Sequence, residues 1–351
     1  MTGAALLRRL AAALTAACCL SCGSLALAAK APELLAVDAS FQPAEMAAKV
    51  LAVSDTTTLK GITRVAVPLF AVEFVTADQV SASTSGFAAA GRARSSLYYK
   101  LLGVGEADFQ AITDALYADF LRDLAASGLE VVAPEQVQAS PAYSKLASSG
   151  SVPPIRSDSA ITLAPPGLAV YGFAKSASGG NNGGVFGAIA SIGSNMAAVG
   201  SAFDAIELSK ELGASLIEVQ MRVNFVQLTD NNRGFLGRIS GTASATGKVN
   251  PSIGSLLVSV QNGPARSAVT MKNTLTLDSA AFSEVREKAA SAGDIAGSVA
   301  VGLLRMAIGS SDSSSSSEME AVADPVRYRE VVGAGLGTVR QMLVVRLAQE
   351  R

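Results

Sequence analysis

The residue types that carry most enzyme chemistry are nearly missing from this chain. It contains no histidine, and its three cysteines, Cys18, Cys19 and Cys22, all lie near the amino terminus. A nucleophile activated by histidine is therefore excluded, and so is an imidazole metal ligand or proton shuttle. If the first residues are removed as a leader, thiolate chemistry and a structural zinc site are excluded as well.

The remaining routes to catalysis are carboxylate pairs, Ser–Lys pairs and a metal held by oxygen ligands. No spacing of these residue types along the sequence singles out a site. We therefore predict a protein without catalytic residues, cofactor-binding residues, metal ligands or a cofactor. An enzyme that uses carboxylates or a Ser–Lys pair is an alternative that the composition leaves open.

The amino terminus has the pattern of a cleaved export signal. Arg8 and Arg9 precede a short apolar run over residues 10–20, and residues 26–28 (Ala-Leu-Ala) supply a small-residue cleavage site. The apolar run is too short to span a bilayer as a helix. We expect residues 1–28 to be removed and the mature chain to be periplasmic or secreted. Lipidation of a signal-region cysteine, which would give an outer-membrane lipoprotein, is the alternative.

Charge and length bound the mature chain further. The sequence has 28 Lys and Arg against 29 Asp and Glu, and loss of the two signal arginines makes it more acidic. This balance argues against a nucleic-acid binder, which needs a basic face. Composition predicts an exported domain over residues 29–308, a Ser-rich linker over 309–324 and a carboxyl-terminal helix over 325–351.

Hydrophobic periodicity predicts an α/β-like first half. Residues 62–75 are rich in Val, Ile and Phe and predict a buried strand, in which Pro68 indicates a bulge or an edge position. Residues 106–127 predict a helix with one apolar face, and residues 129–134 predict a strand parallel to the first. The remaining expectations are helices over 43–53 and 135–146, a mobile or functional stretch over 76–96, a loop up to residue 166 and a strand over 167–174.

The second half alternates with the period of strands. Residues 215–225 place Ile217, Val219, Met221, Val223 and Phe225 on one side, and Glu218, Gln220, Arg222 and Asn224 on a side expected to face water. Further strands are expected over 239–250, 255–260 and 268–278, with a turn at 250–254. Helices are expected over 279–309 and 325–350. The predicted fold class is α+β, with a mixed sheet, flanking helices, an antiparallel meander and two carboxyl-terminal helices.

Residues 176–203 carry no charged side chain. From Ile189 onward the large apolar residues recur at helical steps, which predicts a helix beginning near Val185. A neighbouring face of this helix is small and forms a candidate packing or interface surface made of Gly187, Ala190, Ser194, Ala197 and Ser201. We expect this helix to pack on the sheet or on a partner chain; contact with a membrane and poor order are the alternatives.

The order of these segments resembles a known family. The strand "RVAVPLF", the helix "FQAITDALYADFLRDL", the segment "GLEVVAPEQVQ" and the strand "LIEVQMRVNFVQLTD" follow one another within residues 62–230. This order is similar to that of CsgG-like envelope proteins and their relatives with a TolB-amino-terminal-like domain. The resemblance implies a periplasmic α/β domain that acts through envelope or oligomeric contacts without catalysis. Some members insert β-hairpins into the outer membrane, and residues 239–260 could imitate such a hairpin.

The expected function is that of a non-catalytic, exported cell-envelope protein that acts through protein–protein contacts, as an assembly or secretion accessory. A protein partner or self-association is expected, and nucleic acid is not. The alternative from another class is an oligomeric pore-forming or membrane-associated envelope protein, whose lipid-facing strands would need a continuous apolar band. Residues 239–260 offer little bulk for such a band.

Overall fold

We describe the chain from a computed structural model, which covers residues 33–83, 94–171, 196–230, 243–288, 303–308 and 314–351. The expected export signal at residues 1–28 lies outside this range and stays a prediction. The described residues combine helices with two mixed sheets, so the α+β fold class is confirmed.

The larger sheet, sheet A, has eleven strands and the smaller, sheet B, has four. Sheet A consists of β1 (Leu34–Ala36), β2 (Leu51–Val53), β3 (Arg64–Val75), β6 (Glu130–Val131), β7 (Ile155–Arg156), β8 (Ala160–Leu163), β9 (Ser215–Asp230), β10 (Ala243–Asn262), β11 (Ala265–Met271), β12 (Thr274–Thr276) and β14 (Leu303–Ile308). Sheet B consists of β4 (Ala77–Ser83), β5 (Arg94–Leu102), β13 (Phe282–Glu287) and β15 (Ser314–Ala323). The helices are α2 (Pro43–Val50), α3 (Glu106–Ala126), α4 (Pro134–Gln138), α5 (Pro141–Ser148), α6 (Met196–Leu212) and α8 (Pro325–Glu350).

β3 is a central strand of sheet A, as its apolar composition predicts. It runs parallel to β9 and to β6 and antiparallel to β8. All eleven of its residues after Arg64 are buried and ten of them are apolar, as expected for a strand that is covered on both faces. Its pairing with β9 slips between Ala66 and Leu69, so Pro68 sits in a bulge, where a missing backbone N–H is tolerated. The bulge reading of Pro68 is confirmed.

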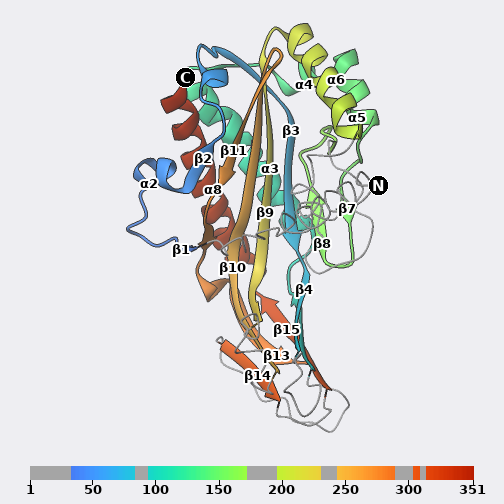
Figure 1. The fold of residues 1–351 in the computed structure, drawn as a ribbon, viewed down its shortest axis with the longest axis vertical. Helices are drawn as coiled ribbons and strands as arrows, with labels where there is room; N and C mark the ends of the chain where they lie inside the picture. Colours follow the sequence, from blue (N-terminus) through green and yellow to red (C-terminus); the bar gives the residue numbers. More distant parts are fainter. Residues whose placement is uncertain (1–32, 84–93, 172–195, 231–242, 289–302, 309–313) are drawn as a thin grey trace, which may run out of the picture. The chain divides into compact units, whose positions relative to one another are not determined.

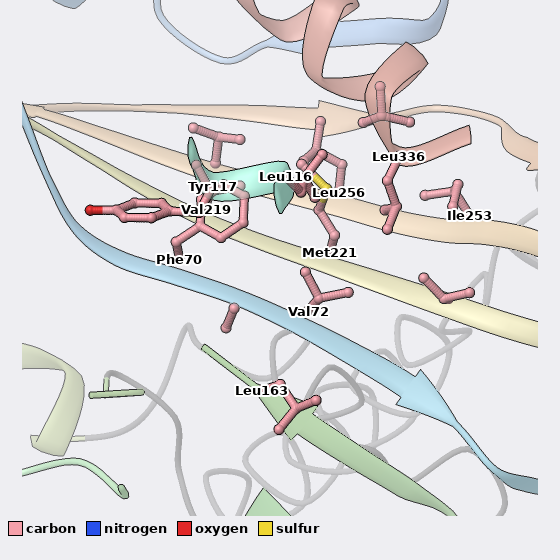
Figure 2. Packing of buried hydrophobic residues seen from close by; sticks show 14 of the residues in the cluster. Phe70, Val72, Leu116, Tyr117, Leu163, Val219, Met221, Ile253, Leu256 and Leu336 are labelled. Atoms are coloured by element: carbon pink, nitrogen blue, oxygen red, sulfur yellow. The ribbon is translucent and has the colours of Figure 1, made fainter. Parts of the chain in front are cut away.

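α3 covers one face of β3 with the apolar stripe that its sequence predicts. Phe109, Ile112, Leu116, Phe120 and Leu124 are all buried. The ring of Phe120 lies 5.7 Å from that of Phe70 on β3, and Figure 2 shows Phe70, Val219 and Met221 on neighbouring strands, facing Leu116 and Tyr117. The helix ends before Gly128, whose φ of 87° is a left-handed conformation that suits glycine.

α8 lies beside α3 on the same face of sheet A, and the two helices run in the same direction. Arg329 pairs with Asp108, Arg340 with Asp119, and Arg351 donates to Ser127 O, so contacts advance together along both chains. Figure 1 shows α3 and α8 on the same side of the long strands β9 and β10. The predicted helix over 325–350 is confirmed.

β9 and β10 form the antiparallel pair expected from the alternating pattern, and β11 continues the meander. The turn predicted at residues 250–254 is wrong. β10 runs unbroken from Ala243 to Asn262, and the pairing with β9 instead slips twice, between Val249 and Ser252 and between Ile253 and Ser255. The turn-forming residues are absorbed as bulges, so residues 239–260 do not make the separate hairpin that the family resemblance allowed.

Four of the shorter predictions need correction. The helix expected over 43–53 ends at Val50, because Leu51–Val53 pairs with β11 as β2. The helix expected over 135–146 is two helices, since Pro141 starts a new one and Ser140 Oγ caps it by accepting from Tyr143 N at 3.2 Å.

The loop expected up to residue 166 contains β7 and β8. The strand expected over 167–174 is wrong in its described part. Within residues 167–171 the structure has one isolated bridge, between Ser151 and Val170.

The remaining corrections concern strands that the sequence did not predict or predicted with other bounds. The polar stretch 76–96 contains β4 and the start of β5, which form an antiparallel pair. The single strand expected over 268–278 is divided into β11 and β12. The first of the two predicted carboxyl-terminal helices, over 279–309, is wrong, because its described residues hold a short 3-10 turn, β13 and β14. The predicted linker over 309–324 contains β15, which runs parallel to β5.

Candidate functional site

The small-residue surface predicted from the sequence lies mostly outside the described residues. Gly187, Ala190 and Ser194 are not covered by the structure, whereas Ala197 and Ser201 belong to α6. The described part of that helix begins at Met196, and the predicted start near Val185 falls outside it. The interface role of these five residues therefore stays a prediction, and the geometry of the described residues brings other positions forward.

Sheet B offers an open edge at each side. Its order is β13-β15-β5-β4, so within the described chain β4 and β13 each pair with one neighbour. The edges differ in their side chains. β13 carries Glu284, Arg286 and Glu287, and charges of this kind discourage pairing with another strand. β4 carries Gln79, Ser81 and Ser83 on its outward-facing side and contains neither Lys nor Pro.

The outer face of sheet B is held by ion pairs between neighbouring strands. Arg286 Nε lies 2.8 Å from Glu320 Oε2, and Lys288 Nζ lies 2.6 Å from Glu318 Oε2. The carboxylates beside Lys288, Glu318 above all, raise the pKa of its ammonium group. A charged face of this composition suits water rather than lipid, because lipid-facing strands need an apolar band.

The inner face of sheet B packs closely against the lower part of β9 and β10. Tyr99 of β5 is fully buried there, and its ring occupies the space beside Gly247 of β10. A Cβ atom at residue 247 would lie 2.5 Å from the Tyr99 ring, which is too close for any side chain. Glycine therefore lets the two sheets approach each other at this point.

The polar side of β9 is less exposed than its sequence predicted. The alternation predicted that Glu218, Gln220, Arg222 and Asn224 face water, but Glu218 and Gln220 are each only 9% exposed. The prediction of a wet face is wrong for these two residues. The alternating pattern identified which residues share a face, but it contained no information about the segments that cover it.

Glu218 lies in a buried polar cluster. Its Oε2 atom is 3.3 Å from Arg266 Nη2 of β11, and Arg266 Nε donates to Ser259 Oγ of β10 at 2.8 Å. Burial raises the pKa of Glu218, and the Arg266 charge and the hydroxyl groups of Tyr171 and Ser259 offset this only in part. The cluster brings Tyr171 next to three strands, β9, β10 and β11.

A second ionic cluster lies where the chain leaves sheet A for sheet B. Arg222 Nη1 lies 3.4 Å from Glu73 Oε1, and Arg222 Nε donates to Asn224 Oδ1 at 3.2 Å. Burial raises the pKa of Asp78, the second residue of β4. The backbone N–H of Gln79 and the charge of Arg222 offset this rise only in part. Gly254 leaves room for the Asn224 amide, since a Cβ atom at residue 254 would collide with it.

Neither cluster has the composition of a metal site. Among the described residues, no group of three or more His, Cys, Asp or Glu side chains could hold a metal ion. α8 is the one described helix with the length and apolar composition to cross a membrane. Its buried residues, including Leu336, Val339 and Leu343, belong to the hydrophobic core of the described residues.

Comparison with known proteins adds no family assignment to this geometry: no protein-family model, curated protein or solved structure matches the chain.

Proposed function

We propose that this chain is a non-catalytic, exported envelope protein that acts by binding protein, and that β4 is its contact edge. The observation that carries the proposal is the character of β4, an outer strand of sheet B that contains no proline and whose outward-facing side chains, Gln79, Ser81 and Ser83, carry no charge. A strand from another polypeptide that adds to such an edge gains a row of backbone hydrogen bonds.

The backbone geometry identifies the groups that would make the contact. Leu101 N donates to Thr76 O at 2.8 Å, which sets the phase of the β4–β5 ladder. Hydrogen-bonded and non-bonded pairs alternate in an antiparallel ladder, so Val80 and Ala82 direct their backbone groups toward β5. Ser81 and Ser83 direct theirs to the open edge. Ala77 fits this phase, since its N–H donates to Ser159 O on the side away from β5 at 3.1 Å.

The test is photo-crosslinking in cells that export the full chain. A photoreactive residue at Gln79 should form an adduct with a second polypeptide, either another copy or a different protein. The same residue at Gln341, which is exposed on α8, should not. Absence of an adduct at Gln79, or equal adducts at both positions, would contradict the proposal.

A pair of variants at Ser81 separates edge pairing from ordinary surface contact. Ser81→Pro removes an outward N–H and also the hydrogen bond between the Ser81 and Ser96 hydroxyl groups. Ser81→Ala removes the same side-chain bond and keeps the N–H. With the probe at Gln79, we expect the adduct to be lost in Ser81→Pro and kept in Ser81→Ala.

An oligomeric pore-forming or membrane-associated protein is the second candidate. One observation favours it. Six strands end at the same side of the two sheets, namely β4, β5, β9, β10, β14 and β15. The registers of Ser83 with Arg94, Ala245 with Asp230, and Ala243 with Ile308 indicate this. The charged outer face of sheet B argues against lipid contact by these strands. Release of a trapped dye from anionic liposomes by the purified chain would favour this second candidate over the first.

A further inference from the structure

The two partners of the Glu218–Arg266 ion pair differ sharply in exposure. The Glu218 side chain is 11% exposed, whereas that of Arg266 is 52% exposed. The carboxylate has therefore given up most of its hydration and receives one guanidinium contact at 3.3 Å in return. Arg266 keeps water on the rest of its side chain, so it can leave the pair without being buried alone.

The groups around Glu218, apart from Arg266, are uncharged. Tyr171, 4% exposed, and Ser259, 8% exposed, place hydroxyl groups beside the carboxyl group, and a hydroxyl group both donates and accepts. On β3 the register neighbour is Leu69, and on β9 the flanking residues on the same face are Leu216 and Gln220.

Two acidic side chains of α6 have partners elsewhere. Glu207 pairs with Lys145, and Glu211 accepts from Ala142 N. Arg266 is therefore the described cation that faces Glu218.

We propose that Glu218 and Arg266 form an acid-operated release. On acidification Glu218 takes up a proton from the solvent and stays inside the fold, while Arg266 loses its partner and becomes an unpaired cation on the surface of β11. The change adds one positive charge to the protein, at the half-exposed end of the pair. The buried carboxyl group responds to the pH, and the exposed guanidinium group carries the resulting unpaired charge at the surface.

This inference is independent of the proposed role of β4. Its physical basis is that desolvation disfavours the ionised carboxyl group, while a partner in water gives only partial compensation. The direction agrees with the raised pKa of Glu218, whose first cause is burial. Because a protonated carboxyl group carries no charge, its burial costs less than that of a carboxylate, so acid releases Arg266 without unfolding the strands.

The test is a pH titration of the full chain by NMR, following side-chain carboxyl carbons and arginine Nε–H groups. Glu218, assigned by comparison with Glu218→Gln, should titrate above the exposed glutamates. The Arg266 Nε–H resonance should move with the same midpoint. Arg266→Gln should shift the Glu218 midpoint still higher, because the guanidinium group is what lowers it.

The controls make each outcome decisive. Glu218→Gln should keep the backbone spectrum of the wild type and abolish the pH response of Arg266. Glu207→Gln, in an ion pair whose side chains are 54% and 55% exposed, should leave the Arg266 response unchanged. A Glu218 midpoint at or below that of exposed glutamates, or an Arg266 resonance that ignores it, would overturn the proposal.

Discussion

The two faces of β9 use opposite means to exclude water. On one face Val219, Met221 and Val223 are fully buried and lie toward apolar side chains such as Leu116 and Leu336 of α3 and α8. On the other face Glu218 and Arg222 are held by ion pairs, and their side chains are 11% and 19% exposed. The first face depends on shape and area, and the second depends on each polar group keeping its partner.

This difference predicts different responses to mutation and to pH. Removal of apolar volume is felt on the α3 side in proportion to the atoms lost, because a close-packed core relaxes only partly. On the polar side a substitution acts through charge and close approach, so its effect changes with protonation and with the partner residue.

The largest expected loss is on the apolar face. Phe120→Ala removes a fully buried ring that contacts Phe70, and we expect the free energy of unfolding to fall by about 3–5 kcal/mol. Ala115→Ser, at an exposed position of the same helix, should change it by less than about 0.5 kcal/mol. Chemical denaturation measures both, and similar losses would mean that the apolar face does not dominate.

The next effect is expected where sheet B covers the polar face of β9 and β10. Gly247→Ala places a methyl group against the Tyr99 ring, and we expect a loss of about 1–3 kcal/mol from overpacking. Tyr99→Val opens the same space, so the double variant should lose less than the sum of the two single variants. Strict additivity in denaturant unfolding would show that the sheets do not meet at this point.

A smaller effect, of opposite sign, is expected on the outer side of α8. Gly333 lies inside the helix with nothing within 4 Å of its missing Cβ atom. Gly333→Ala should therefore raise the free energy of unfolding by about 0.5–1 kcal/mol through helix propensity alone. A lower thermal midpoint in Gly333→Ala would show that another residue lies close to this side of α8.

The smallest effect is a change in the slope of stability with pH on the polar face. Burial raises the pKa of Asp78 above its usual value of 3.8, so the folded state holds this proton to higher pH than the unfolded state. The stability from protonated Asp78 is complete below pH 3.8 and is lost as the pH rises through the folded pKa. Asp78→Asn should thus gain on the wild type between low and neutral pH, in denaturation at several pH values. A constant difference between the two proteins would show that Asp78 titrates normally.

The sequence predicted an element correctly where the spacing of its apolar residues agreed with the faces that are buried in the fold. α3 and β3 have apolar spacing that repeats over several turns or residue pairs, and both were predicted within a few residues of their ends. β15 was not predicted, because Ser314–Ser317 has no strand propensity of its own. It becomes a strand through pairing with β5, more than two hundred residues earlier in the chain.

The candidate site was harder to predict than the fold. The alternation in β9 placed Glu218 and Gln220 on one face, but their burial is caused by segments that the pattern does not include. β4 was part of a stretch expected to be mobile or functional, and its position as an edge follows only from the full strand order. Burial and edges are properties of the assembled sheet, so no local signal reports them.

The parallel pairing of α3 with α8 has a consequence for the order in which the chain becomes compact. α8 is the last element in sequence, and its Tyr328 ring lies 5.9 Å from Phe109 of α3. A growing chain can form α3 and β3 early and stack Phe109 on Phe74, but the side of Phe109 that meets Tyr328 stays uncovered until α8 arrives. Contacts between such distant segments slow folding, because the intervening loop must close first. The polypeptide therefore lacks a complete core until its last segment has been synthesised.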